Sequence, residues 1–119
     1  MNPNNSIRIS ELSSVLLNAE IGTSLCSSME KVYSKFGSVT VDFSDTQFMS
    51  TAFLNHSLGQ FCMNHKLEYE NFFNIVQVTS LDEDGMDDIR LVVFNAVERW
   101  KSLESGYDLE QLYNVELPV

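Results

Sequence analysis

The chain has 119 residues, of which 44% are hydrophobic, and its 17 acidic side chains outnumber the 7 basic ones to give a formal net charge of −10. A chain of this length holds one domain with a modest core and leaves no room for a separate catalytic domain. The strongly negative field repels nucleic acid and anionic membranes, so we expect neither as a partner and favour a basic protein surface instead.

The first six residues, 1–6, are rich in asparagine and predict a disordered N-terminus. They contain neither the basic nor the apolar region of a signal peptide. No apolar run elsewhere in the sequence approaches the roughly 18 residues that would cross a bilayer. We therefore expect a cytoplasmic protein.

Two short strands and a helix are predicted in the N-terminal third. Ile7 and Ile9 alternate with a polar residue, which is typical of an edge strand, and the apolar run at 15–17 predicts a second strand after a turn. A helix follows, because apolar side chains recur at three- and four-residue spacing between residues 25 and 36.

The two ends of this helix carry recognisable signals. Thr23 or Ser24 is suited to cap its start, since a hydroxyl can accept a hydrogen bond from a free backbone N–H. Gly37 marks its end, because glycine readily adopts the left-handed conformation that commonly terminates a helix.

A buried strand at residues 39–43 forms the centre of the predicted sheet. Val39, Val41 and Phe43 share one face of this strand, because side chains alternate from one face to the other, and polar residues occupy the opposite face. A short turn then leads into a helix predicted over about residues 51–66, whose apolar positions recur at helical spacing.

Two further elements complete the pattern. Residues 72–78 predict a second central strand, and the acidic turn at 82–85 leads into a last long helix with an apolar stripe from Met86 to Trp100. Strands that alternate with helices argue for an α/β fold in which helices pack on a small mixed sheet. The strands at 39–43 and 72–78 should be adjacent and parallel, because a crossover helix joins them.

The strand, turn and helix of residues 39–54 resemble the centre of the STAS fold, which is known from anti-sigma factor antagonists. The closer resemblance is to the STAS-like family of small bacterial proteins (DUF4325-type), which shares a Val-x-[Val/Ile]-Asp-Phe strand and, after a short turn, [Ile/Met]-Ser-[Ser/Thr]-x-Phe. Both motifs are present, as Val39–Phe43 and Met49–Phe53, and the resemblance extends from about Ile7 to Trp100. The other landmarks are Ile7–Ile9, Gly22, Glu70–Val78 and Arg99–Trp100.

The resemblance implies a STAS-like α/β domain over residues 7–103, with a small mixed sheet of about four strands packed with three helices. The segment 104–119 lies largely beyond the resemblance. It contains several leucine, valine and tyrosine residues and is too apolar for a solvated tail, so we expect a C-terminal extension docked on the domain or on a partner. The sequence leaves the oligomeric state open, a homodimer included.

Ser50 and Thr51 are the candidate phospho-acceptors. Either hydroxyl is placed to cap the helix that follows, and the free N–H groups and positive dipole at a helix start suit a phosphoryl group. In phosphorylatable STAS antagonists, which this segment resembles, the acceptor serine follows an aspartate at this point, so the resemblance places Thr51 at the acceptor position and Ser50 at that of the aspartate. The plainer interpretation is an ordinary N-cap, worth about 1 kcal/mol.

The predicted contact surface for a partner protein surrounds this helix start. Its candidate residues are Asp42, Ser44, Asp45, Phe53, Asn55 and His56. The two aspartates could also hold a magnesium ion, which prefers carboxylate ligands, although an aspartate beside a turn is more often simply solvated.

Metal, redox and catalytic sites are not predicted. The acidic stretch 82–88 lacks the glycine and glutamate positions of an EF-hand and is explained by a helix start. Cys26 and Cys62 each fall on an apolar helix face without a C-x-x-C pair, and His56 and His65 have no third ligand at useful spacing. Glycine-rich phosphate loops and G-x-S-x-G elbows are absent from the sequence, so we expect no cofactor and no enzymatic activity.

These observations favour a non-enzymatic regulatory module that binds another protein. The resemblance implies a histidine-kinase-like ATPase as the partner, which would phosphorylate the hydroxyl at the helix start or be held by the module. The alternative is an acidic inhibitor protein from a phage or mobile element that mimics nucleic acid by its charge. A carboxylate cluster on one face would favour the inhibitor, whereas acidic residues spread over the helices would favour the regulator.

Overall fold

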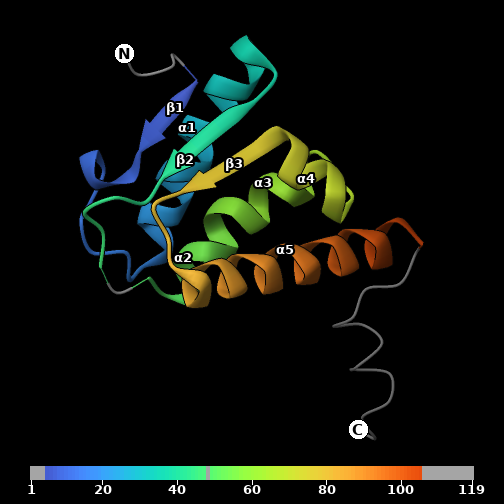
Figure 1. Cartoon of the computed structure of the whole chain (residues 1–119). Coiled ribbons are helices and arrows are strands. Elements are labelled where there is room, and N and C mark those ends of the chain that lie inside the picture. Colours follow the sequence, from blue (N-terminus) through green and yellow to red (C-terminus); the bar gives the residue numbers. More distant parts are fainter. Residues whose placement is uncertain (1–4, 48, 106–119) are drawn as a thin grey trace, which may run out of the picture.

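Three parallel strands form one sheet in the order β1–β2–β3 in the computed structural model, which describes residues 5–47 and 49–105 (Figure 1). The strands are β1 (Ser6–Arg8), β2 (Val39–Asp42) and β3 (Val76–Thr79). Because β2 pairs in parallel with both neighbours, the carboxyl ends of all three strands lie at the same edge of the sheet. The predicted parallel pairing of the central strand with a strand that includes residues 76–78 is confirmed.

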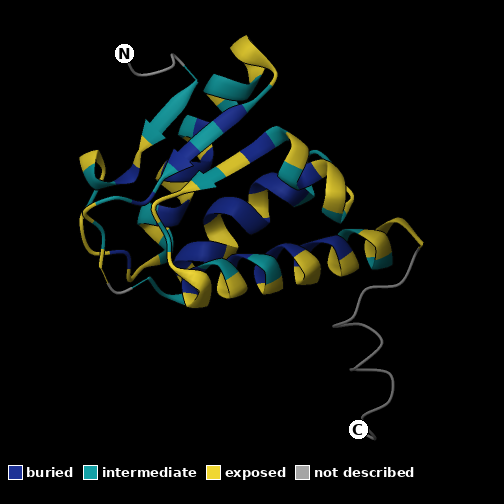
Figure 2. Cartoon of the chain, viewed as in Figure 1, coloured by how far each residue is buried: buried dark blue, intermediate teal, exposed yellow. Residues whose placement is uncertain are grey.

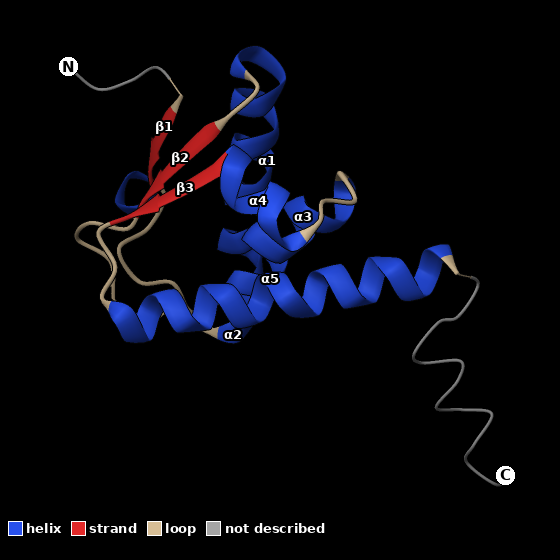
Figure 3. Ribbon diagram, turned by 45° about the vertical axis from the view of Figure 1, so that its right-hand side comes forward, coloured by secondary structure: helices blue, strands red, loops and turns tan. Residues whose placement is uncertain are grey.

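Helices connect the strands, as parallel pairing requires. A 3₁₀ turn, η1 (Ile9–Glu11), and then α1 (Ala19–Phe36) lie between β1 and β2, and a helical stretch over residues 51–64, which we call the central helix, follows β2. α4 (Tyr69–Ile75) precedes β3, and α5 (Glu83–Glu104) follows it. Figures 1 and 3 show α1, the central helix and α5 on one side of the sheet.

The predicted fourth strand and mixed direction are wrong, since the described residues form three strands that are all parallel. Residues 15–17 make only an isolated bridge, between Val15 and Gln47. They run beside the loop that precedes the central helix, where the Leu16 N–H donates to the Gln47 carbonyl (3.0 Å) and the Gln47 N–H donates to the Ser14 carbonyl (2.7 Å). Leu16 is fully buried, so its apolar character reflects a core contact rather than membership of the sheet.

One face of the sheet is apolar and covered by the helices (Figure 2). Val39, Val41 and Val76 are almost completely buried there. The strand register aligns Ile7 and Val78 with Val41, so these two side chains extend the same layer to both edge strands. The alternation predicted for the central strand is therefore confirmed on its apolar side.

The opposite face of the sheet is polar. Its aligned residues are Ser6, Thr40 and Gln77 in one row and Arg8, Asp42 and Thr79 in the next. Each of the six retains some exposure to solvent. This sheet thus has a single buried face. Burial of one face alone explains why apolar and polar residues alternate in the sequence of the central strand.

α1 begins earlier than predicted. Its N-cap is Asn18, whose side-chain oxygen accepts a hydrogen bond from the backbone N–H three residues further on, at 2.9 Å. The predicted caps, Thr23 and Ser24, lie inside the helix and are exposed. The end is as predicted, because Gly37 has φ = 75° and its N–H donates to the Tyr33 carbonyl.

The central helix contains a π-helical turn. It is built from α2 (Thr51–Leu54), the π-helical turn η2 (Asn55–Gly59) and α3 (Gln60–Asn64). The hydroxyl of the buried Ser57, within this turn, donates to the Phe53 carbonyl at 2.8 Å and so satisfies both groups in the core. Single π-helical turns inside α-helices occur frequently at functional sites, which makes the side chains around this turn candidates.

The first half of the segment predicted as a strand at 72–78 is helical instead. α4 continues to Ile75, and only the remaining residues enter β3. Tyr69 and Phe73 pack edge to face with ring centroids 5.1 Å apart, and Phe72 is fully buried. These contacts at helical spacing override the strand propensity of the phenylalanines. α4 is therefore a helix in addition to the three that were predicted.

α5 carries the acidic stretch in its first turn rather than in a preceding turn. The Asp82 side chain caps the helix by accepting a hydrogen bond from the Gly85 N–H at 2.8 Å. Glu83 and Asp84 then face the positive end of the helix dipole. The buried stripe consists of Gly85, Ile89, Val92, Val93, Ala96 and Val97. None of the helices among the described residues is long and apolar enough to cross a bilayer.

The segments predicted at the two chain ends fall partly outside the described residues. Ser6 already belongs to β1, and the Asn5 carbonyl accepts a hydrogen bond from the Thr40 N–H at 2.8 Å, so the predicted disordered segment 1–6 is too long. Residues 1–4 lie outside the described residues. The predicted C-terminal extension also lies outside them from residue 106 onwards, while Glu104 still belongs to α5.

Candidate functional site

Ser50 caps the start of the central helix. Its Oγ accepts a hydrogen bond from the Phe53 N–H (3.1 Å) and donates one to the Leu17 carbonyl (2.8 Å). The Ser50 N–H donates in turn to the Leu16 carbonyl (2.8 Å). Ser50 is thus the N-cap, one of the two residues predicted for this role, and its hydroxyl is engaged as both donor and acceptor.

Thr51 is the first residue of the central helix and is exposed. Within the part of the chain that the structure describes, its hydroxyl has no hydrogen-bond partner. Of the two candidate hydroxyls, that of Thr51 is therefore the accessible one.

Apolar side chains open to solvent lie beside this helix start. Leu17, whose carbonyl receives the Ser50 hydroxyl, is 57% exposed, and Leu12 and Val15 in the same loop are also exposed. Single exposed apolar residues are common on protein surfaces, but three within six residues of one loop are a local concentration of exposed apolar side chains. The helix start thus combines a free hydroxyl with a surface suited to contact another protein.

A second polar group lies at the carboxyl edge of the sheet. Asp42, the last residue of β2, accepts hydrogen bonds from the Ser44 N–H (2.9 Å) and the Ser44 hydroxyl (3.1 Å). Asp45 forms an ion pair with Arg8, the last residue of β1, at 2.7 Å between Oδ2 and Nη2. Asp45 and Ser80, which follow β2 and β3, both have positive φ values, of 60° and 67°. Ligands of open α/β sheets bind outside this edge at a point where the strand order reverses, and the order β1–β2–β3 of the described residues contains no such reversal.

The hydrogen bonds to Asp42 hold the pKa of its carboxyl below the usual value, first through the Ser44 N–H and then through the hydroxyls of Ser80 and Ser44 and the charge of Arg8. The ionised carboxylate therefore contributes stability that is present above the unfolded pKa of about 3.9 and lost as the pH falls through the lower folded pKa. We expect Asp42→Asn to be less stable than the native chain at neutral pH, and the difference to shrink in acid. Urea titrations at neutral pH and at about pH 3 measure this, and an unchanged difference would contradict it.

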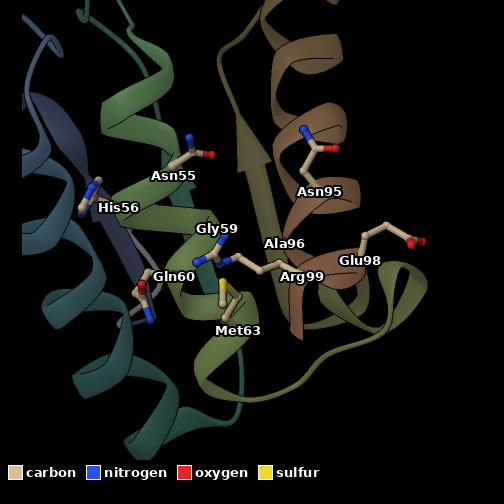
Figure 4. Close-up of a pocket in the computed structure, with 9 residues that line it drawn as sticks. All are labelled: Asn55, His56, Gly59, Gln60, Met63, Asn95, Ala96, Glu98 and Arg99. Atoms are coloured by element: carbon tan, nitrogen blue, oxygen red, sulfur yellow. The ribbon is translucent and has the colours of Figure 1, made fainter. Parts of the chain in front are cut away.

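Asn55 and His56 lie at a different place, in a groove between the central helix and α5 (Figure 4). The groove has a volume of about 510 Å³. Its lining residues are Asn55, His56, Gly59, Gln60 and Met63 of the central helix, and Asn95, Ala96, Glu98 and Arg99 of α5. Figure 4 shows the Arg99 side chain reaching from α5 toward the central helix. The π-helical turn supplies Asn55, His56 and Gly59 to this wall.

Phe53 does not belong to the predicted contact surface. Its side chain is fully buried, and its backbone carbonyl faces Gly22 of α1. Its backbone N–H contributes to the helix start by donating to Ser50. Phe53 is therefore a core residue, and we remove it from the candidate surface.

The structure separates the remaining candidates into three groups. Asp42, Ser44 and Asp45 lie at the sheet edge, residues 50–51 at the helix start, and residues 55–56 in the groove. No side-chain hydrogen bond or ion pair joins the three groups among the described residues, although the Asn55 N–H donates to the Thr51 carbonyl within the helix.

Sequence reasoning missed the second wall of the groove and the partners at the sheet edge. Asn95, Glu98 and Arg99 border the apolar stripe of α5, and this border position is visible in the sequence. The apolar stripe of α5 has a polar border on each side. The angle at which α5 crosses the central helix decides which border lines the groove, and the spacing of apolar residues in the sequence does not determine this angle. Ser80 follows the strand pattern at 72–78, so the shared carboxyl edge of parallel strands could have identified it, whereas Arg8 lies inside the pattern at 7–9 and carried no such signal.

The two cysteines are core residues. Burial raises the pKa of both the Cys26 and the Cys62 thiols to about 11, so they remain protonated and weakly reactive at neutral pH. Among residues 5–47 and 49–105, no group of three or more histidine, cysteine, aspartate or glutamate side chains is arranged to hold a metal ion.

Residues 22–86 match the family described as STAS-like domain of unknown function (DUF4325). The match covers more than half of the chain, and the protein belongs to this family. It contains both motifs that carry the resemblance, Val39–Phe43 and Met49–Phe53, but it is shorter than the predicted span from Ile7 to Trp100. No curated protein and no solved structure matches the chain.

Proposed function

We propose that the protein is a non-enzymatic regulatory module that binds another protein through the start of the central helix. The observation that carries the proposal is the accessible Thr51 hydroxyl at a helix N-terminus, next to the exposed apolar loop that contains Leu17. A partner could contact the hydroxyl and the apolar side chains at the same time. Phosphorylation of the hydroxyl would then change the affinity of that contact. The Ser50 cap holds both parts together, because it bonds to the helix and to the loop.

The regulation that we propose is phosphorylation of Thr51 by a histidine-kinase-like ATPase partner. Thr51 stands at the position of the acceptor serine in the STAS antagonists that the chain resembles. A phosphoryl group there would carry close to two negative charges and would lie at the positive end of the helix dipole. The same charge beside Leu17 would oppose docking of an apolar or acidic partner surface, so binding would be released.

The distribution of charge supports the regulator over the acidic inhibitor. Carboxylates occur on α1, α4 and α5, and several are paired with lysine or arginine side chains of the same chain. Glu68 accepts from Lys101 at 2.8 Å, and Asp87 accepts from Arg90 at 2.6 Å. A nucleic-acid mimic would instead present a row of unpaired carboxylates on one face.

We expect Thr51→Glu to weaken partner binding by about 1–3 kcal/mol, the scale of desolvating a new unpaired charge in an interface, and to leave the fold intact. Thr51→Ala should weaken binding less, because it removes only a hydroxyl. The native chain serves as bait in its host, and the captured partner is then titrated calorimetrically with each variant. Thr23→Glu, at an exposed threonine of α1, is the matched control for added charge.

Equal affinity of the native chain and Thr51→Glu would place the contact elsewhere. Phosphorylation is tested separately by incubating the captured partner, ATP and the chain, followed by mass spectrometry of the phosphorylated peptide. Transfer to the native chain but not to Thr51→Ala is the expected result. Binding of the partner without phosphoryl transfer would support the proposed contact and contradict the proposed phosphorylation.

A further inference from the structure

The groove between the central helix and α5 continues into a second hollow of about 270 Å³. The second hollow is lined by Met63, Lys66, Trp100, Leu103 and Glu104. Met63 lines both hollows, so they adjoin at its side chain. We call the two together the seam groove, and it follows α5 from Asn95 to the last residue of the helix, Glu104.

The seam groove exposes apolar surface in its second half. Leu103 is 46% exposed, and Met63 and Trp100 lie beside it, each only partly buried. Trp100 is held in place, because its indole N–H donates to the Leu67 carbonyl at 2.9 Å. A concave surface with a fixed aromatic ring and open apolar side chains is typical of a binding site.

The chain itself supplies a segment that fits this surface. Residues 106–119 follow directly after α5, whose last residue lines the seam groove. The apolar residues of the segment are Tyr107, Leu109, Leu112, Tyr113, Val115, Leu117 and Val119. The way back from Glu104 to Asn95 along α5 is about 14 Å, whereas a segment of this length spans about 21 Å as a helix and more if extended. Its length is therefore sufficient to cover the whole groove.

The segment carries three carboxylates, of Asp108, Glu110 and Glu116, and no basic side chain. Lys66 and Arg99 line the seam groove together with Glu98 and Glu104, so the charges of the groove balance, and the proposal rests on its apolar surface and on the length of the segment. Lys66 is paired with Glu104 at the end of α5, so it lies where the segment would turn back.

We propose that the seam groove is the docking site of the chain's own C-terminal segment, residues 106–119. The segment folds back along α5 and packs its leucine side chains on Met63, Trp100 and Leu103. Docking removes the exposed surface of Leu103 from solvent. This contact is independent of the surface at Thr51, so either one can fail without the other.

Trp100 reports on this contact, because it is the only tryptophan in the sequence. In the full-length chain, Leu109→Asp together with Leu112→Asp should make Trp100 more accessible to acrylamide quenching and shift its emission to longer wavelength. Leu103→Glu, on the groove side, should have the same effect. The segment variant and Leu103→Glu disrupt the same contact. Combining them should therefore increase the quenching of Trp100 little beyond that of either variant alone.

Two controls carry the same added charge without touching the proposed contact. Leu91→Glu changes an α5 residue that is 59% exposed and lies outside the seam groove. Gln111→Glu with Asn114→Asp adds charge at polar positions of the segment. Neither should alter the quenching of Trp100. Quenching that is the same in all variants as in the native chain would overturn the proposal.

Amide exchange of the intact chain tests the segment directly. Docking should slow exchange within residues 109–117 by about tenfold or more relative to the Leu109→Asp, Leu112→Asp variant, in a chain of monomeric mass. Exchange at the rate of an unstructured peptide would overturn the proposal. Protection that grows with concentration and accompanies a dimeric mass would also overturn it, because the groove would then hold the segment of a second copy.

Discussion

Replacing Val41 by aspartate should unfold the domain or leave it without fixed tertiary packing. Val41 is completely buried at the centre of β2, and its register partners Ile7 and Val78 belong to the same apolar layer. An unpaired carboxylate there costs several kcal/mol, against a total stability of about 5–15 kcal/mol for a domain. Loss of the near-ultraviolet circular dichroism signal and of a cooperative urea transition would be the expected observations.

Thr40→Asp is the matched control, one residue away on the polar face of the sheet. Thr40 is only partly buried, and its register partners are Ser6 and Gln77. The added carboxylate can remain hydrated, so the variant should fold and unfold cooperatively with a much smaller loss. Equal losses for the two variants would show that the polar face is as closed to water as the apolar one.

The sequence predicted the centre of the sheet well because β2 is buried on one face only. Alternation is readable where one face is apolar and the other polar, as at 39–43. It failed at 15–17, where three consecutive apolar residues meet a loop rather than a strand, and only Leu16 is fully buried. Short apolar runs of this kind do not by themselves distinguish a strand from a packed loop.

The sequence of α4 does contain a helical pattern, although residues 72–78 were predicted as a strand. Tyr69, Phe72 and Phe73 stand at the three- and four-residue spacing of a helix, and Phe73 packs on both of the other rings. The strand propensity of phenylalanine concealed this spacing. Only the last part of the segment, from Val76, shows the alternation of β3, buried at Val76 and exposed at Gln77.

At the candidate site, the sequence indicated a helix cap but not which hydroxyl remains free. Ser50 and Thr51 are adjacent and chemically alike, and only the contact of Ser50 with Leu17, 33 residues away, decides that Ser50 is engaged. Phe53 could have been assigned to the core, since Phe53, Ser57 and Phe61 recur every four residues and all are buried. The second wall of the groove required the packing of two helices, which periodicity alone does not determine.

Gly22 shows how closely α1 approaches the central helix. It precedes the helix predicted between residues 25 and 36, but it lies inside α1 and is buried. A Cβ atom at this position would stand 2.5 Å from the Phe53 carbonyl oxygen and 3.0 Å from the His56 Cβ atom. The first distance is far below a normal contact, and the obstacle is backbone rather than a flexible side chain. The two helices can therefore pack at this separation only with glycine here.

Gly22→Ala should consequently destabilise the domain, although the same change in an unobstructed helix interior stabilises by about 1 kcal/mol. The added methyl group must push α1 away from the central helix, and overpacking of this kind costs about 1–3 kcal/mol. Gly59→Ala is the matched control, because Gly59 is also buried in a helix, but the atom nearest to its Cβ would be a Val92 side-chain methyl at 3.3 Å, and the nearest backbone atom, the Leu54 carbonyl oxygen, lies at an ordinary contact distance of 3.5 Å. Urea titrations should rank Gly22→Ala well below Gly59→Ala in unfolding free energy. If the two variants are equally stable, the helices separate without cost, and the close approach at the Phe53 carbonyl does not hold the central helix in place.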